Sequence, residues 1–192
     1  MLNKNIFVIL NGLELKGLEI LELEIRAKYN MRTNLLGIFE IESSEFKKLE
    51  NNLCQKNIKF EIKNKEQNIF QGIIKEVICE NLSDTRVVLR IEAIDSTYVL
   101  DEECKNRIYQ DTNISYKTIV EDILKNRGIN YHISKSFDKK IDKIFYQNET
   151  DWKFLVRISS YIGEPIFITT EGVILFGSDN IYNVESVKEN VV

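Results

Sequence analysis

The sequence has little histidine, cysteine, proline or glycine, and these shortages argue against a closed zinc site, disulfides and flexible linkers. Of its 192 residues only one is histidine, His132, so the His and Cys ligand set of a closed zinc site cannot be assembled. The three cysteines, Cys54, Cys79 and Cys104, are odd in number and far apart, which favours reduced, buried thiols over disulfides. With one proline and eight glycines, no stretch has the composition of a flexible linker.

Charge of one sign and long apolar runs are also lacking. The chain carries 26 Lys and Arg against 30 Asp and Glu, a formal net charge of −4, so a basic surface for nucleic acid is not expected. No apolar run approaches the roughly 18 to 20 residues of a membrane span, and the first 17 residues lack a small-residue cleavage site. We therefore expect neither membrane insertion nor a signal peptide. The 43% of hydrophobic residues suffices for a folded core.

Alternation of apolar and polar residues predicts a β-rich first half. Residues 21–29 alternate strictly, which predicts a strand with Leu21 on its apolar face. A short helix is expected to interrupt the strands, with Ser43 or Ser44 as its N-cap. Short strands at even spacing are typical of a small barrel or sandwich. The other expected strands lie at residues 6–10, 35–41, 58–63, 67–79 and 87–93.

The second half changes to helical spacing. Apolar residues from Tyr116 to Leu124 recur at i, i+3, i+4, i+7 and i+8, which predicts a helix after Ser115 with Gly128 as its left-handed cap. A second helix is expected between Thr150 and Gly163. Further strands are expected at 130–133 and 143–146, with a hairpin over 166–176. The prediction is a mainly β protein with an N-terminal β domain over 1–98 and an α+β domain with two helices over 99–192.

Two groups of carboxylates are candidate chemical sites. Glu22 and Glu24 project from one strand face, as paired acid and base groups do, but Arg26 follows on that face, which favours a solvated charge ladder. The run from Asp101 to Glu103 lacks the D-x-D-x-D-G spacing of a calcium loop, so a solvated loop is expected.

Histidine and lysine residues give no stronger indication of a functional site than the carboxylates do. His132 has no adjacent acid, and no nucleophile or phosphate-loop motif occurs in the chain. The lysines at 135, 139, 140 and 143 are interleaved with Asp138 and Asp142, which is weak support for an anion partner. The residues by themselves predict no catalytic group, no cofactor and no metal.

The segment from Phe145 to Gly163 carries the most specific pattern. It resembles the signature Q-x-x-E-[ST]-D-x-x-F-L-x-R, followed by a glycine, of the phage late-control D and VgrG family of tail-hub proteins. Upstream, residues 71–77 resemble the family's G-I-V-x-x-V strand, and residues 107–111 resemble its R-S-F-Q-D entry to the second domain. Residues 93–101, which lie between them, add to the resemblance. The matching positions of the signature are Gln147, Glu149 (offset by zero or one residue), Thr150, Asp151, Phe154, Leu155, Arg157 and Gly163.

This resemblance implies a structural protein without enzymatic activity. It implies a homotrimeric hub that joins the tail tube to the spike of a contractile phage tail or related injection machine, cytoplasmic before assembly and part of the baseplate afterwards. Family hubs have two barrel-like domains per subunit, so that three copies form a pseudo-sixfold ring that fits a hexameric tube. Because the chain stops at Val192, shorter than family members, a truncated or split hub is also open.

Two other classes of function remain open from the residues. One is a β-rich binding module that recognises a partner protein or a surface glycan, for which exposed aromatic residues around a groove would be the sign. The other is a hydrolase, which needs carboxylates within about 5 to 10 Å that face a common cleft. A flat, apolar, self-complementary surface would favour the hub.

The helix after Thr150 has two apolar sides. At 100° per residue, Trp152 and Val156 lie together, apart from the wide stripe that includes Phe154 and Ile158. Either Trp152 and Val156 are covered by the preceding loop or the terminal hairpin, or they meet a neighbouring subunit, where tryptophan is a frequent anchor.

Overall fold

The computed structural model describes residues 6–65, 67–125 and 127–179, and the chain forms two compact units. Unit 1 consists of the residues up to Ala27, Arg32–Ser96 and Thr170–Gly172, and unit 2 of Lys28–Met31, Thr97–Thr169 and the residues from Val173 onward. Each unit has its own cluster of buried apolar side chains. The described residues are mainly β, as predicted, and no helix among them is long and apolar enough to cross a membrane.

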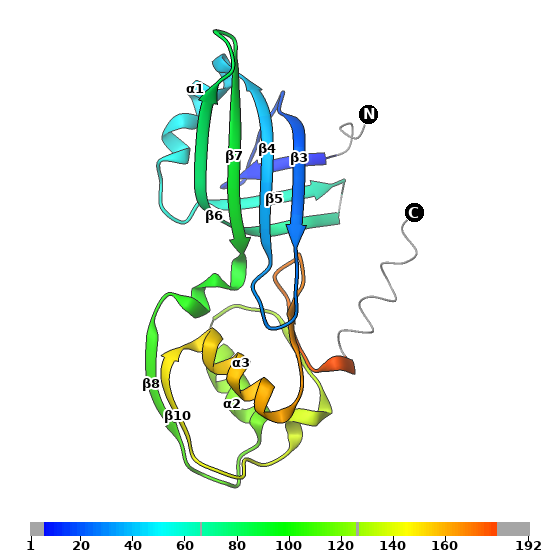
Figure 1. Cartoon of the computed structure of the whole chain (residues 1–192), viewed down its shortest axis with the longest axis vertical. Coiled ribbons are helices and arrows are strands. Elements are labelled where there is room, and N and C mark those ends of the chain that lie inside the picture. The colour runs from blue at the N-terminus through cyan, green and yellow to red at the C-terminus, as the bar shows by residue number, and fades with distance from the viewer. Residues whose placement is uncertain (1–5, 66, 126, 180–192) are drawn as a thin grey trace. The chain divides into compact units, whose positions relative to one another are not determined.

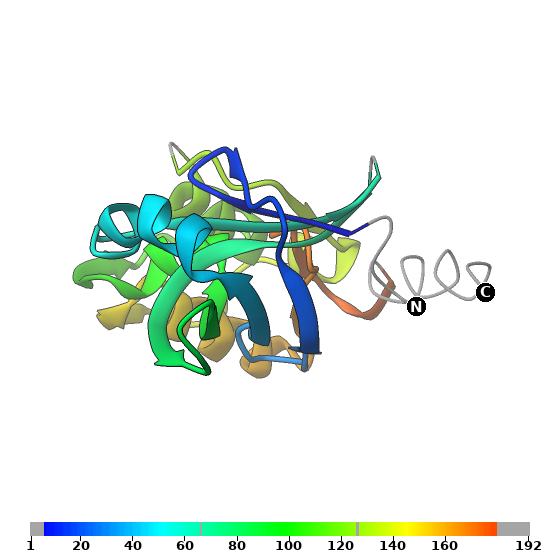
Figure 2. The same cartoon turned by 90° about the horizontal axis from the view of Figure 1, so that it is seen from above.

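Unit 1 is built on one antiparallel sheet of seven strands that curls on itself (Figures 1 and 2). The sheet has the order β2-β1-β5-β6-β7-β4-β3, and helix α1 (Ser43–Leu53) packs against β4 and β7. Buried aromatic and branched side chains fill the core, among them Phe39, Phe60 and Phe70. The strands are β1 (Ile6–Leu10), β2 (Leu13–Glu14), β3 (Glu19–Arg26), β4 (Asn34–Glu42), β5 (Lys59–Asn64), β6 (Gln67–Asn81) and β7 (Arg86–Asp95).

The long strand β6 makes the corner of this sheet. Its first half pairs with β5 up to Ile73, and its second half pairs with β7 from Gly72 to Asn81 (Figure 1). The register shifts between Ile74 and Glu76, which is a β-bulge, and bulges bend strands and increase their twist. The sheet therefore curls because β6 is bent and its two halves pair with different strands.

Three expectations, two for unit 1 and one for the cysteines of both units, are wrong in detail. In β3 the register shifts between Ile20 and Glu22, and this irregularity leaves Leu21 51% exposed instead of facing the core. The N-cap of α1 is Glu42, without a side-chain cap hydrogen bond, in place of Ser43 or Ser44. The thiols predicted to be buried are all exposed, because Cys54, Cys79 and Cys104 sit at a helix end and at outward strand positions.

The described part of unit 2 contains helices α2 and α3 and two small sheets (Figure 1). One sheet is the antiparallel pair β8 and β10, and the other has the order β11-β12-β9. Helices α2 and α3 pack against each other, and α3 packs against β10. The elements are β8 (Cys104–Tyr109), α2 (Tyr116–Leu124), β9 (Tyr131–Ile133), β10 (Phe145–Thr150), α3 (Asp151–Ile162), β11 (Ile166–Ile168) and β12 (Ile174–Phe176).

The ends of α3 agree with the sequence, whereas one end of α2 differs. The Thr150 hydroxyl accepts from the Lys153 amide, and Gly163 ends α3 with a φ of 83°, a left-handed conformation that glycine adopts without strain. Helix α2 begins after Ser115 as predicted, with Ser115 as its N-cap, but the C-cap is Lys125 with a φ of −55°. Gly128 is left-handed, with a φ of 65°, but it lies in the loop beyond the helix end.

Candidate functional site

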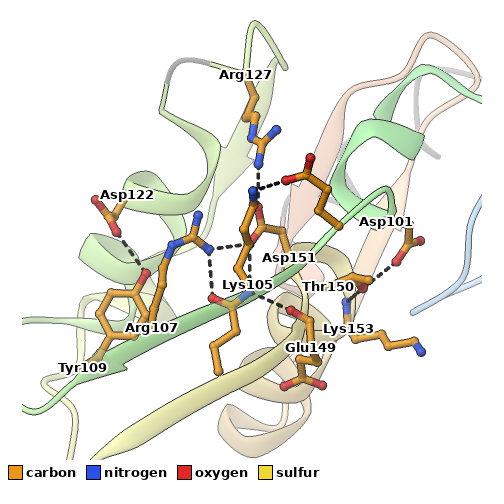
Figure 3. Close-up of polar contacts among 12 residues, drawn as sticks. Asp101, Lys105, Arg107, Tyr109, Asp122, Arg127, Glu149, Thr150, Asp151 and Lys153 are labelled. Atoms are coloured by element: carbon orange, nitrogen blue, oxygen red, sulfur yellow. Dashed lines mark hydrogen bonds and ion pairs between the residues drawn. The ribbon is translucent and has the colours of Figure 1, made fainter.

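The residues that match the family signature meet where strand β10 runs directly into helix α3. Asp151 is the first residue of α3, so its carboxylate lies at the positive end of the helix dipole. Its side chain is buried, and a buried carboxylate is costly unless charged or hydrogen-bonding groups compensate it. We call Asp151 and the polar residues linked to it the motif cluster: Asp101, Arg107, Arg127, Gln147, Glu149, Thr150, Asp151 and Arg157. Figure 3 shows how most of them converge.

Three side chains compensate the Asp151 carboxylate. Arg107 of β8 and Arg127, from the loop after α2, each form an ion pair with it, and the Arg127 Nη2 to Asp151 Oδ2 distance is 2.9 Å (Figure 3). The Gln147 amide donates to Asp151 Oδ1 at 2.8 Å, and Gln147 Oε1 accepts from Arg107 at 2.9 Å. Two cations and one amide from three different parts of unit 2 thus hold a single carboxylate.

The electrostatic consequence is a low pKa for this carboxyl. Burial alone raises the pKa of Asp151, but hydrogen bonds from Arg107 and Gln147, together with the positive charges of Arg107 and Arg127, outweigh burial and lower it. Asp151 is therefore ionised at neutral pH.

A second contact of the motif cluster fixes the start of α3 to the chain before β8. The Thr150 hydroxyl donates to Asp101 Oδ1 at 2.6 Å while it accepts from the Lys153 amide at 3.3 Å. Asp101 lies at the end of the 3-10 helix Ser96–Asp101. The expectation of a solvated loop is thus wrong for Asp101, although Glu102 and Glu103 are exposed.

Arg157 ties α3 back to β10. Its Nε donates to Glu149 Oε1 at 2.8 Å, and its Nη2 donates to the Tyr146 carbonyl oxygen at 2.7 Å. The guanidinium also lies 4.9 Å from the ring centroid of Phe154, which is close enough for a cation–π contact. The register of the strand and the rotation of the helix are therefore linked by one side chain.

The apolar signature residues have core positions. Phe154 is fully buried and stacks on Tyr109 of β8, with ring centroids 5.8 Å apart and planes 13° apart. Leu155 is fully buried as well. The Tyr109 hydroxyl donates to Asp122 of α2 at 2.9 Å, so this aromatic pair joins β8 to both helices. Burial, with the hydrogen bond to Asp122, raises the pKa of Tyr109.

Taken together, these contacts give the signature a physical role in folding. Each polar member binds another member or a backbone group, so the motif cluster orients β8, β10, α2 and α3. Nowhere in the described ranges do three or more His, Cys, Asp or Glu side chains gather as metal ligands would.

Trp152 and Val156 belong to the core of unit 2. Trp152 is 6% exposed within a single chain, and Val156 is partly buried against the same apolar cluster. This burial agrees with the alternative in which the chain itself covers them. The interface alternative for Trp152 stays a prediction, which the Trp152→Ala variant described in the Discussion tests.

The remaining candidates from the sequence are scattered. Glu24 pairs with Arg26 on the exposed edge strand β3, as a charge ladder does. His132 is exposed on β9, opposite Leu175. Among the lysines, Lys143 places its ammonium group 3.5 Å from the Tyr161 ring centroid, which is a structural contact. These groups do not converge with the motif cluster.

Sequence reasoning missed the role of Arg107 and did not single out Arg127. For Arg107 the local signal is weak, because residues 104–109 do not alternate between polar and apolar side chains as a strand with one buried face does. For Arg127 no local signal exists, because its partner is 24 residues away in a different element.

An open polar groove lies at the start of α1. It is lined by Glu42, Ser43, Ser44, Lys47, Asp84, Thr85 and Arg86, none of which is aromatic. A surface rich in exposed aromatic residues, which a glycan-binding module would use, is not found there.

A family model matches more than half of the chain. The model of the family described as the Alg8 N-terminal domain matches residues 54–187 of this chain. This family is a different one from the late-control D and VgrG family that the signature resembles. No curated protein sequence matches the chain.

The fold is similar to solved structures of tail proteins. The 43 kDa tail protein of prophage MuSo2 from Shewanella oneidensis matches 91% of this chain over 52% of its own, with 12% identity and a TM-score of 0.69. A tail protein from Neisseria meningitidis MC58 matches 90% over 50% of its own, with 14% identity and a TM-score of 0.63. This chain thus spans about half the length of each tail protein.

A chain of a PdpA–VgrG complex has a similar fold. In the lidded PdpA–VgrG complex of Francisella, the match covers 98% of this chain and 30% of the other, with 14% identity and a TM-score of 0.61. At such low identities the likeness concerns the fold alone. That fold is one found in phage tail proteins and VgrG complexes.

Proposed function

We propose that this chain, which belongs to the Alg8 N-terminal domain family, is a structural hub subunit of a contractile phage tail or related injection machine. In that role it joins the tail tube to the spike. The observation that carries the proposal is the fold match over 91% of the chain to a prophage tail protein, which extends over both compact units.

The chemistry of the motif cluster supports a structural role. A catalytic site needs polar groups that stay available for a substrate, with pKa values suited to proton transfer. In the motif cluster the Asp151 carboxylate is bound by Arg107, Arg127 and Gln147, and its pKa is lowered. These groups are occupied in holding one another.

The proposed assembly is a homotrimer with tube and spike proteins of the same machine as its partners. Three subunits with two barrel-like domains each would present a pseudo-sixfold ring to a hexameric tube. Because the chain spans about half of each similar tail protein, a truncated or split hub is part of the proposal. The subunit is proposed to be cytoplasmic before it enters the tail or baseplate.

The alternative is a β-rich module that binds a partner protein or a glycan. The groove at α1 gives it little support, because its lining is polar and charged without an aromatic platform. The fold match therefore favours the hub over the binding module.

The test uses the host cell. An epitope-tagged copy is expected to co-purify with assembled tails, and gold-labelled antibodies are expected to mark one end of the tube in electron micrographs. Deletion of the gene should leave tube and sheath proteins unassembled, while a plasmid copy restores particles. Intact tails in the deletion strain, or label along the whole tail, would overturn the proposal.

A further inference from the structure

The ladder of β8 and β10 has all of its charged residues on the inner side, which faces α3. That side carries Lys105, Arg107, Gln147 and Glu149, all members or neighbours of the motif cluster. A half-buried strand usually shows the reverse arrangement, with charges in water and apolar side chains inward. The outward side of this ladder is therefore unusual.

The outward side has an apolar end. Ile108 and Tyr146 are direct cross-strand partners and are 60% and 61% exposed. Ile144, two residues before Tyr146, is 48% exposed. Large side chains that are directly opposite in a ladder lie within contact distance. We call the outward residues Cys104, Asn106, Ile108, Ile144, Tyr146 and Asn148 the outer face.

The outer face has no charged side chain, although 29% of the chain is charged. Exposed positions on other strands are different: β3 exposes Glu19, Glu22 and Arg26, and β6 exposes Lys75 and Glu76. Depletion of charge, together with exposed tyrosine and large aliphatic residues, is characteristic of the centre of protein interfaces.

We infer that a second copy of this chain covers the outer face. The inference rests on the proposed hub function, in which copies assemble side by side. Two copies carry the same net charge of −4 and repel each other, so they approach at least electrostatic cost where the facing surface has no charge. The outer face is such a surface, and covering Ile108, Tyr146 and Ile144 removes apolar area from water.

Cys104 provides a native reporter for this contact. Its thiol is exposed, and its position on β8 places it on the outer face with Asn106 and Ile108. The other two cysteines belong to unit 1 and can be replaced by serine at exposed positions.

The experiment follows Cys104 in a Cys54→Ser and Cys79→Ser background. The rate of maleimide labelling is measured over a range of protein concentrations, in parallel with the molar mass from light scattering. If labelling occurs only in free subunits, the rate should fall about tenfold when nine tenths of the chains are assembled. An assembled state in which Cys104 reacts at the monomer rate would overturn the inference.

Charge-introducing variants give an independent readout. Ile108→Lys and Tyr146→Lys should each raise the dissociation constant of the assembly about 30-fold or more, because burying an unpaired charge at an interface centre is costly. Leu82→Lys, at an exposed turn of unit 1, is the matched control and should leave assembly unchanged. Tryptophan emission for the two unit 2 variants, and circular dichroism for Leu82→Lys, confirm that each variant is folded.

The outcomes separate this inference from the proposed function. If Ile108→Lys and Tyr146→Lys assemble as well as the wild type, the outer-face contact is overturned, while tail localisation in the host would still support the hub. A chain that stays monomeric, with fast Cys104 labelling at every concentration, would also overturn the inference. The deletion experiment in the host then decides the function by itself.

Discussion

At the residue scale, Asp151 is the position on which most contacts of the motif cluster depend. It is the shared partner of two arginines and an amide, and it begins a helix. The sequence singled out Asp151 through the family resemblance, but the resemblance names no partner. Arg107 and Arg127 become its partners only because β8 and the loop after α2 fold against the start of α3, which is a tertiary effect.

The first prediction concerns the charge of Asp151. Asp151→Asn keeps the shape but removes the negative charge that compensates Arg107 and Arg127, and it places an amide donor beside their N–H groups. We expect unit 2 to lose about 2 to 3 kcal/mol of unfolding free energy. Urea titration followed by tryptophan emission measures this loss. Asp84→Asn, at an exposed turn, is the control; equal stability of the two variants would contradict the prediction.

The second prediction is the pH dependence of that contribution. The pKa of Asp151 is lowered in the folded chain, so the stabilisation is complete above the ordinary value of 3.8 and is lost as the pH falls through the lower folded value. The wild type and Asp151→Asn should therefore differ most at neutral pH and converge in acid. Urea titrations at a series of pH values test this, and a constant difference would count against it.

The third prediction concerns Trp152, which is buried in the core of unit 2. Trp152→Ala should cost about 3 kcal/mol or more, because a large cavity remains in the apolar cluster. Circular dichroism during urea unfolding measures the loss, with Val156→Ala as the comparison, since Val156 is only partly buried and should cost less. Weakened assembly with unchanged monomer stability would instead restore the interface alternative.

At the element scale, periodicity predicted the existence of most strands and helices but not their irregularities. The alternation at 21–29 identified β3, yet it gave no indication of the bulge that exposes Leu21, because a bulge depends on the partner strand. The strand β8 was overlooked because its inward residues, such as Lys105 and Arg107, are charged and its outward residue Ile108 is apolar. A search for apolar inward and polar outward residues therefore does not identify such a strand.

The fourth prediction concerns the corner of the curled sheet at Gly72. A Cβ atom there would lie well inside van der Waals contact with the backbone carbonyl oxygen of Ile94, which belongs to β7 and cannot move like a side chain. Gly72→Ala should therefore cost unit 1 about 1 to 3 kcal/mol through strain. Thermal unfolding by circular dichroism measures it. Glu76→Ala, at an exposed position of the same strand, should be nearly neutral.

At the scale of the whole molecule, the sequence indicated a β-rich first half and helices in the second, but not the tertiary pairing of strands. The parallel pairing of β12 with β9 joins segments about 40 residues apart, and nothing local in either segment specifies its partner. The curl of the seven-stranded sheet likewise depends on β6 changing partners along its length.

The fifth prediction is that the two units unfold as distinguishable transitions, since each has its own apolar cluster. Trp152 is the single tryptophan and lies in unit 2, so its emission reports that unit. Gly72→Ala should shift a transition seen by circular dichroism while the midpoint of the emission change stays in place. Equal shifts in both signals would show that the units unfold together.

The membership of Thr170–Gly172 in unit 1 has a consequence for folding during synthesis. The Gln71 amide donates to the Thr170 carbonyl oxygen at 2.9 Å, so unit 1 contains a contact between residues 99 positions apart (170 − 71). A ribosome that has reached Ser96 must add 76 more residues (172 − 96) to complete unit 1, which takes about 4 to 15 s at typical rates. During that interval unit 1 lacks its last native segment, Thr170–Gly172, and it is completed only after most of unit 2 has been synthesised.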